Sequence, residues 1–170
     1  MSDGYEGGDF DRAVALVSAE RSPRALVERL GIDWDYLTWL AADASAAVLG
    51  EQGEERGVVV SYAAEAFTAG FLIGVHVLDE PLPEPDRLGA SVDRVQVRGR
   101  HAVIADHCDL TSVARLETVY AEALVESMAV VRDEREPLRA PVTRVFETGL
   151  AVGLELRSGG DDGRTAPEET

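Results

Sequence analysis

The alternation of apolar and polar residues divides the first half of the chain into predicted helices. Over residues 34–48, apolar side chains recur at steps of three and four residues, directly after Asp33, which suits an N-cap. Residues 54–78 are apolar nearly all round, which in a soluble chain indicates a helix enclosed by neighbours. Two shorter helices are predicted before these, at residues 10–20 and 23–31.

The second half repeats this order after a connector at residues 79–111. A third long helix is predicted after Asp109 or Thr111, and Pro141 is expected to open a fourth that ends near Leu156. Within the connector, residues 87–105 fit a helix by apolar spacing. They also fit a small β-hairpin at 94–104 by alternation and β-branching. We favour the helix.

The two halves resemble each other when the chain is shifted by 79 residues. Residues 37–77 then align without a gap on 116–156, with eight of 41 positions identical. The apolar pattern agrees more closely than the identities do. We therefore predict an all-α helical bundle made of two pseudo-repeats, about 9–79 and 88–157. Each repeat would be a helix hairpin preceded by short helices, and together the hairpins would form a four-helix core.

Glycine pairs spaced by four mark the second helix of each hairpin. A glycine inside a helix costs about 1 kcal/mol against alanine, and close helix packing is one reason to accept that cost. We predict that the two helices cross each other at these faces, within one chain or between two chains. The alternative is two unrelated helices that share a glycine spacing. The predicted contact residues are Phe67, Gly70, Gly74, Phe146, Gly149 and Gly153.

Composition adds an unusual charge. The chain has 170 residues with 32 acidic and 16 basic side chains, a net charge of −16, and every basic residue apart from histidine is arginine. This resembles proteins from organisms with a salt-filled cytoplasm, where screening removes most self-repulsion. A codon bias explains the missing lysine and asparagine equally well. We expect adaptation to high salt.

The remaining segments indicate a single cytoplasmic domain. Residues 1–8 and the acidic tail 158–170 are predicted to be disordered around a helical domain at 9–157. The lone Cys108 excludes an internal disulfide, no signal peptide is recognisable, and the polar positions within 57–78 argue against a membrane span.

A short segment between the halves concentrates reactive side chains. His101, Asp106, His107 and Cys108 are all types that zinc accepts, although their spacing matches no recognised metal motif. Cys108 next to His107 could instead form a nucleophile at the start of the following helix. Solvated or capping side chains, and a buried thiol, are the plain alternatives. No cofactor is expected, since no nucleotide-binding or hydrolase motif is found.

Two further features bear on partners. Residues 22–41 resemble the helix-turn-helix of small transcription regulators, but the helix that would read DNA carries Asp33 and Asp35 and no arginine. A basic stretch could bind an anion or an acidic partner, or could pair with the chain's own carboxylates. Its arginines are Arg87, Arg94, Arg98 and Arg100.

These observations favour a protein-interaction or regulatory module that self-associates. Enzymatic activity is not expected, because no catalytic motif is found. A DNA-associated regulator using residues 22–40 is the alternative, and a metal- or thiol-dependent enzyme centred on 101–109 is the second. Nucleic-acid binding is not favoured, and no membrane partner is expected.

Overall fold

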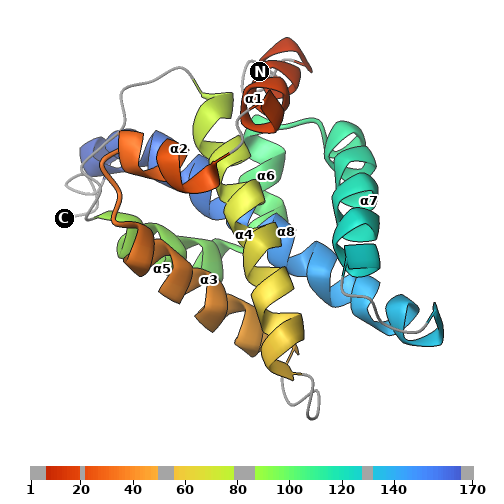
Figure 1. Ribbon diagram of the computed structural model, residues 1–170. Coiled ribbons are helices and arrows are strands. Elements are labelled where there is room, and N and C mark those ends of the chain that lie inside the picture. Colours follow the sequence, from red (N-terminus) through yellow and green to blue (C-terminus); the bar gives the residue numbers. More distant parts are fainter. Residues whose placement is uncertain (1–6, 20–21, 50–55, 79–86, 128–131, 166–170) are drawn as a thin grey trace.

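The chain is almost entirely helical in the residues that the computed structural model describes, which are 7–19, 22–49, 56–78, 87–127 and 132–165. Within these ranges there are eight helices and no strand (Figure 1). The all-α prediction is therefore confirmed. The helices are α1 Gly7–Ala19, α2 Pro23–Arg29, α3 Trp34–Leu49, α4 Arg56–Val77, α5 Leu88–Arg98, α6 Arg100–His107, α7 Leu110–Ser127 and α8 Arg132–Thr165.

Side-chain caps set where several helices begin. The Ser22 hydroxyl accepts the backbone N–H of Ala25 at 3.2 Å, and proline occupies the first position of α2. Asp33 and Asp109 play the same part for α3 and α7, because each carboxylate accepts the backbone N–H two residues further on at 3.2 Å. At the end of α2, Gly31 has a φ of 81°, the left-handed conformation that favours glycine.

The hairpin alternative for residues 94–104 is wrong, because helices α5 and α6 flank Gly99. Gly99 has a φ of 92°, and its N–H bonds to the Val95 carbonyl at 2.8 Å to close α5. Val95 is buried, whereas Val97 is 87% exposed, so the alternating valines do not share a buried strand face. Burial follows the helical spacing of Leu88, Ser91 and Val95 instead.

Helix α8 is longer than the sequence predicted at both ends. It begins at Arg132, nine residues before Pro141, and runs past Ser158 to Thr165. The sequence predicted a start at Pro141 because a proline inside a helix removes one backbone hydrogen bond. The proline-containing connector at 81–85 and the terminal residues 1–6 and 166–170 lie outside the described residues.

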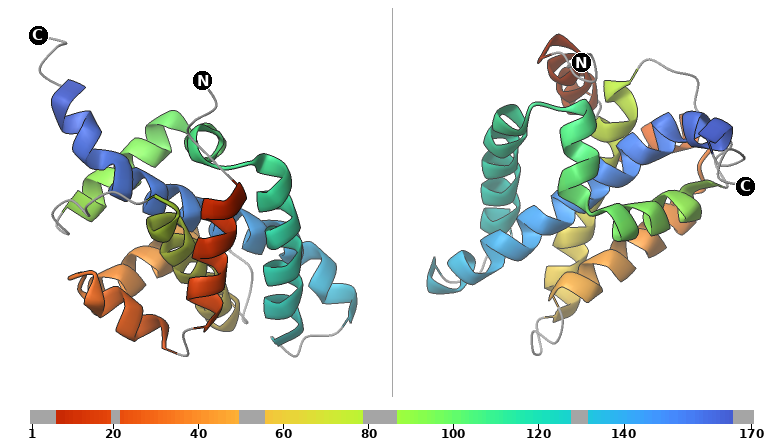
Figure 2. Two further views of the ribbon diagram at one scale, coloured as in Figure 1. Left: turned by 90° about the horizontal axis from the view of Figure 1, so that it is seen from above. Right: turned by 180° about the vertical axis from the view of Figure 1, so that it is seen from behind.

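Helices α4 and α8 cross at the centre of the molecule (Figures 1 and 2). Both are buried along their middle turns, including Phe71 and Leu150, which are fully enclosed. Helices α3 and α7 lie on opposite sides of this crossing, and each contacts both central helices. Helices α1 and α2 pack on α4, while α5 and α6 pack on α8. Among the described residues, no helix is both long and apolar enough to traverse a bilayer.

At the crossing, glycines bring the two backbones into contact within one chain. A Cβ added to Gly70 would lie 2.3 Å from the Phe146 carbonyl oxygen, and one added to Gly149 would lie 2.1 Å from the Phe67 carbonyl oxygen. Gly74 and Gly153 face each other, since a Cβ on either would come within 3.2 Å of the other's Cα. No side chain fits between the helices here.

Candidate functional site

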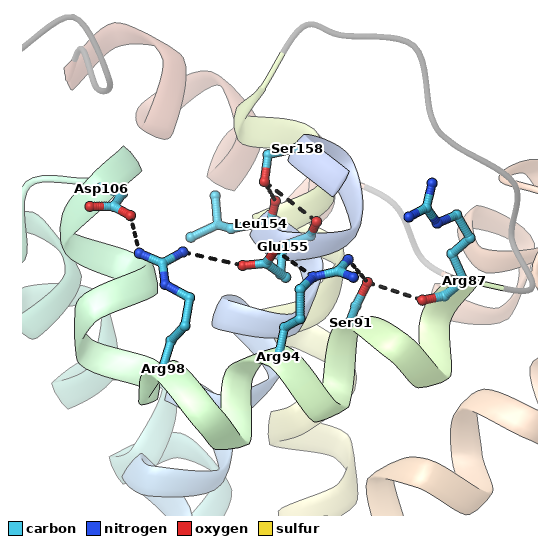
Figure 3. A network of polar contacts seen from close by, with 8 residues as sticks. All are labelled: Arg87, Ser91, Arg94, Arg98, Asp106, Leu154, Glu155 and Ser158. Atoms are coloured by element: carbon cyan, nitrogen blue, oxygen red, sulfur yellow. Dashed lines mark hydrogen bonds and ion pairs between the residues drawn. The ribbon is translucent and has the colours of Figure 1, made fainter. Parts of the chain in front are cut away.

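The basic stretch of α5 and α6 is directed inward, toward two glutamates on α8. Arg94 Nε donates to Glu155 Oε2 at 2.9 Å, and Arg98 Nη1 donates to Glu155 Oε1 at 3.5 Å (Figure 3). The Glu155 side chain is only 2% exposed, whereas the arginines reach solvent at 27% and 43% exposure. A carboxylate buried to this extent needs such partners, because an unpaired buried charge costs several kcal/mol.

Neighbouring polar groups fix the two arginines. Ser91 is fully buried, and its hydroxyl donates to the Arg87 carbonyl at 3.1 Å and accepts from Arg94 at 3.4 Å. Arg98 also pairs with Asp106 on α6. In Figure 3 the Arg87 guanidinium lies apart from Glu155, and Arg87 joins the network through its backbone carbonyl. Two arginines of the predicted anion-binding patch, Arg94 and Arg98, therefore pair with carboxylates of the same chain.

The second glutamate, Glu147, interacts with two residues of α6 and one of α7. Arg100 Nε donates to its Oε1 at 2.7 Å, and His101 Nε2 lies 3.1 Å from the same atom. From α7, Glu117 shares a hydrogen bond with Glu147. Burial would raise the pKa of Glu147, but the hydrogen bonds from Glu117 and Arg100 outweigh it and the pKa is lowered. Burial and the neighbouring carboxylate raise the pKa of Glu117 to about 8.

Glu117 should make stability fall as pH rises toward 8. A carboxyl whose pKa is raised by folding stabilises the folded state below its unfolded pKa, and this contribution is lost as pH rises through the folded value. Glu117→Gln keeps a hydrogen-bond donor and removes the titration. Between about pH 6 and about pH 9, the free energy of unfolding should therefore fall less in this variant than in the parent chain. We expect the difference to be about 1 kcal/mol, allowing for solvent screening. Chemical denaturation at the two pH values measures it.

Glu28→Gln is the matched control for this prediction. Glu28 forms an exposed ion pair with Arg24 on α2, with the two side chains 53% and 61% exposed. Its replacement should leave the pH dependence unchanged, because such pairs contribute little. If Glu117→Gln gave the same pH dependence as Glu28→Gln and the parent chain, the raised pKa of Glu117 in the folded state would be disproved.

The residues predicted as a metal or thiol site do not converge. His101 contacts Glu147, Asp106 pairs with Arg98, and Cys108 is 1% exposed in the core. Among the described residues, no three histidine, cysteine or acidic side chains are grouped so as to hold a metal ion. Burial raises the pKa of the Cys108 thiol to about 12, which disfavours the thiolate that a nucleophile requires.

An exposed aromatic pair lies on the outer face of α3. Tyr36 and Trp39 stack with ring centroids 6.3 Å apart and planes 10° from parallel, and Trp39 is 61% exposed. The Tyr36 hydroxyl reaches α5, where it would lie 3.0 Å from a Cβ added to Gly89. Asp35 and Asp43, both exposed, flank the pair along the helix. We call these four residues, Asp35, Tyr36, Trp39 and Asp43, the aromatic face of α3.

This face bears on the resemblance to a helix-turn-helix. Helices α2 and α3 form with a tight turn at Gly31 between them. The side of α3 that would enter a DNA groove is the aromatic face, which carries two carboxylates. Carboxylates repel the phosphate backbone that supplies most of the affinity of DNA-binding proteins. The surface chemistry of α3 thus argues against DNA contact.

Sequence reasoning identified the arginines but not their partners. The one available signal was that Glu147 and Glu155 are the only charged residues between Val145 and Leu156, an otherwise apolar stretch. Charged residues within a buried helix are normally paired, so both required partners. Which arginines supply them depends on how α5 and α6 pack on α8, about 60 residues away in sequence.

Comparison of the chain with known protein families, with curated proteins and with solved structures found no match. The assignment of a function therefore depends on the site geometry alone.

Proposed function

We propose that this protein is a cytoplasmic protein-interaction module that binds a protein partner through the aromatic face of α3. One observation carries the proposal: Trp39 and Tyr36 stack on the surface instead of in the core. Tryptophan and tyrosine are the side chains most enriched at the centres of protein interfaces. The other chemistry-bearing groups, at Glu147, Glu155 and Cys108, are occupied with internal contacts or buried.

A duplicated architecture supports this interpretation. We infer that α1–α4 and α5–α8 are two copies of one four-helix unit. The contacts at the crossing are reciprocal: Gly70 approaches the Phe146 carbonyl as Gly149 approaches that of Phe67. Burial matches as well, with the pairs Phe10/Leu88, Ala13/Ser91, Leu26/Val103, Val27/Ile104 and Leu37/Val113 buried at corresponding places.

The burial and the caps also refine the alignment of the two copies. A constant shift of 79 residues pairs Leu37 with Leu116. The caps Asp33 and Asp109, by contrast, favour a shift of 76 residues for α3 and α7, which pairs Leu37 with Val113. At that shift Tyr36 and Trp39 correspond to Ser112 and Arg115. The second copy forms the same helix without an aromatic residue at either of these two positions, so the fold does not require them on α3.

Site-specific photo-crosslinking in the native host tests the proposal. A crosslinking amino acid at Ala47, exposed and one turn beyond Asp43, leaves the aromatic face intact. We expect a discrete crosslinked species that disappears when Trp39→Ala is introduced in the same chain. The partner should then bind the purified protein, again in a Trp39-dependent way. The matched position is Val119 on α7, which is 63% exposed and should give no such species.

The mass of the crosslinked species also tests self-association. A product of twice the chain mass would identify a second copy as the partner. The proposed interaction function would then still stand. The glycine faces of α4 and α8 contact each other within one chain, so a dimer would have to form through another surface. Absence of any crosslink at Ala47, or a crosslink that persists in Trp39→Ala, would refute the proposed function.

A further inference from the structure

We propose that the partner segment bound by the aromatic face of α3 is rich in arginine; this inference rests on the proposed interaction function and names the chemistry of its partner. The exposed groups on the face are two aromatic rings between two carboxylates, at Asp35 and Asp43. Aromatic ring faces attract cations, and arginine does so most often among protein side chains. The rings and the carboxylates therefore favour the same kind of ligand.

The spacing of these groups suits a guanidinium. Asp35, Trp39 and Asp43 follow one another at four-residue steps, so all three lie along one stripe of the helix. A planar guanidinium can stack on an aromatic ring while its N–H groups pair with a neighbouring carboxylate. A lysine ammonium has no planar surface to stack and is more strongly hydrated. The stripe offers one ring position and a carboxylate a turn away on each side.

The rings are held in place before any ligand binds. Tyr36 stacks on Trp39 on one side, and its hydroxyl approaches α5 at Gly89 on the other. A preformed platform lowers the conformational entropy lost on binding, which increases affinity. The net charge of −16 adds a long-range attraction for a basic segment.

Other exposed apolar residues do not compete as sites of this kind. Leu16 and Val97 are each exposed singly on α1 and α5, and Leu110 and Val119 lie nine residues apart on α7. Isolated apolar side chains on a surface need no partner. On α7, the position that corresponds to Trp39 is Arg115, which would repel an arginine-rich ligand. The two sides of the molecule therefore differ in the charge and in the aromatic content of equivalent surfaces.

Isothermal titration of the full chain with a synthetic nona-arginine peptide tests this inference. We expect Trp39→Ala to weaken binding about tenfold, and Asp35→Asn with Asp43→Asn to weaken it by a similar factor. Trp39→Phe should restore part of the affinity, and Val119→Ala should leave it unchanged. Because Trp39 and the two carboxylates are exposed, circular dichroism should show that these variants remain folded.

Nona-lysine of equal charge separates arginine recognition from general attraction to an acidic protein. Weaker binding of nona-lysine, with a smaller loss in Trp39→Ala, supports the inference. Equal binding of both peptides, or unchanged nona-arginine binding in Trp39→Ala, would overturn it. A Trp39-dependent crosslink at Ala47 to a partner without a basic segment, or to a second copy, would also overturn it while leaving the proposed interaction function intact.

Discussion

Gly149→Ala is expected to cause a large loss of stability, although alanine is the better helix former by about 1 kcal/mol. The added methyl group would lie 2.1 Å from the Phe67 carbonyl oxygen and 2.8 Å from its carbonyl carbon. These are backbone atoms of a central helix, which cannot move aside as the end of a side chain can. We expect the free energy of unfolding to fall by about 3 kcal/mol, the upper range for overpacking.

Gly89→Ala is the matched control, because Gly89 is also helical. Among the described residues outside its own helix, the only atom near its added methyl group is the Tyr36 hydroxyl at 3.0 Å, the end of a side chain. Its stability should change by about 1 kcal/mol or less, because better helix propensity offsets the contact. Denaturant unfolding of both variants provides the comparison. Equal stability of the two would show that α4 and α8 do not approach as closely as described.

Arg94→Met is expected to destabilise the protein more than Glu155→Met, although each removes one side of the same ion pair. Loss of Arg94 leaves the buried Glu155 carboxylate with Arg98 at 3.5 Å, and we expect a cost of about 3 kcal/mol. Loss of Glu155 leaves arginines that are already part exposed and can turn to water, which we expect to cost about 1 kcal/mol. The measurement is the unfolding free energy of each variant.

The double variant and a surface pair complete this test. Combining Arg94→Met with Glu155→Met should recover stability relative to Arg94→Met alone, because no buried charge remains. Arg24→Met breaks the exposed pair with Glu28 and should change stability by about 0.5 kcal/mol or less. If Arg94→Met were as mild as Arg24→Met, Glu155 would be solvated and not buried.

Much of the architecture could be read from local features of the sequence. Serine, proline and aspartate at helix starts act within a few residues, so Ser22 and Asp33 identify the beginnings of α2 and α3 without knowledge of packing. The glycine spacing in 70–74 and 149–153 conflicted with helix propensity and so indicated a close contact. Whether that contact was within a chain could not be known from spacing alone.

Features that depend on tertiary packing could not be predicted in the same way. The valines at 95 and 97 alternate as in a strand, and only the packing of α5 on α8 shows that one is buried and the other exposed. The start of α8 before Pro141 likewise contradicts a local rule. For the candidate site, the sequence showed Tyr36 and Trp39 in a predicted packing helix. Their exposure and stacking became evident only once Leu37 and Ala41 were seen to form the buried side.

The reciprocal glycine contact has a consequence for stoichiometry. In a symmetric dimer of one four-helix unit, every surface residue would occur twice, and any ligand would bind in pairs. Under the duplication proposed above, fusing two units into one chain would let each change separately while the crossing at Gly74 and Gly153 holds them together. The first half of the chain carries Tyr36 and Trp39, and the second half carries the buried Glu155. Such a chain should bind a single partner segment per molecule, with a defined orientation relative to its second half.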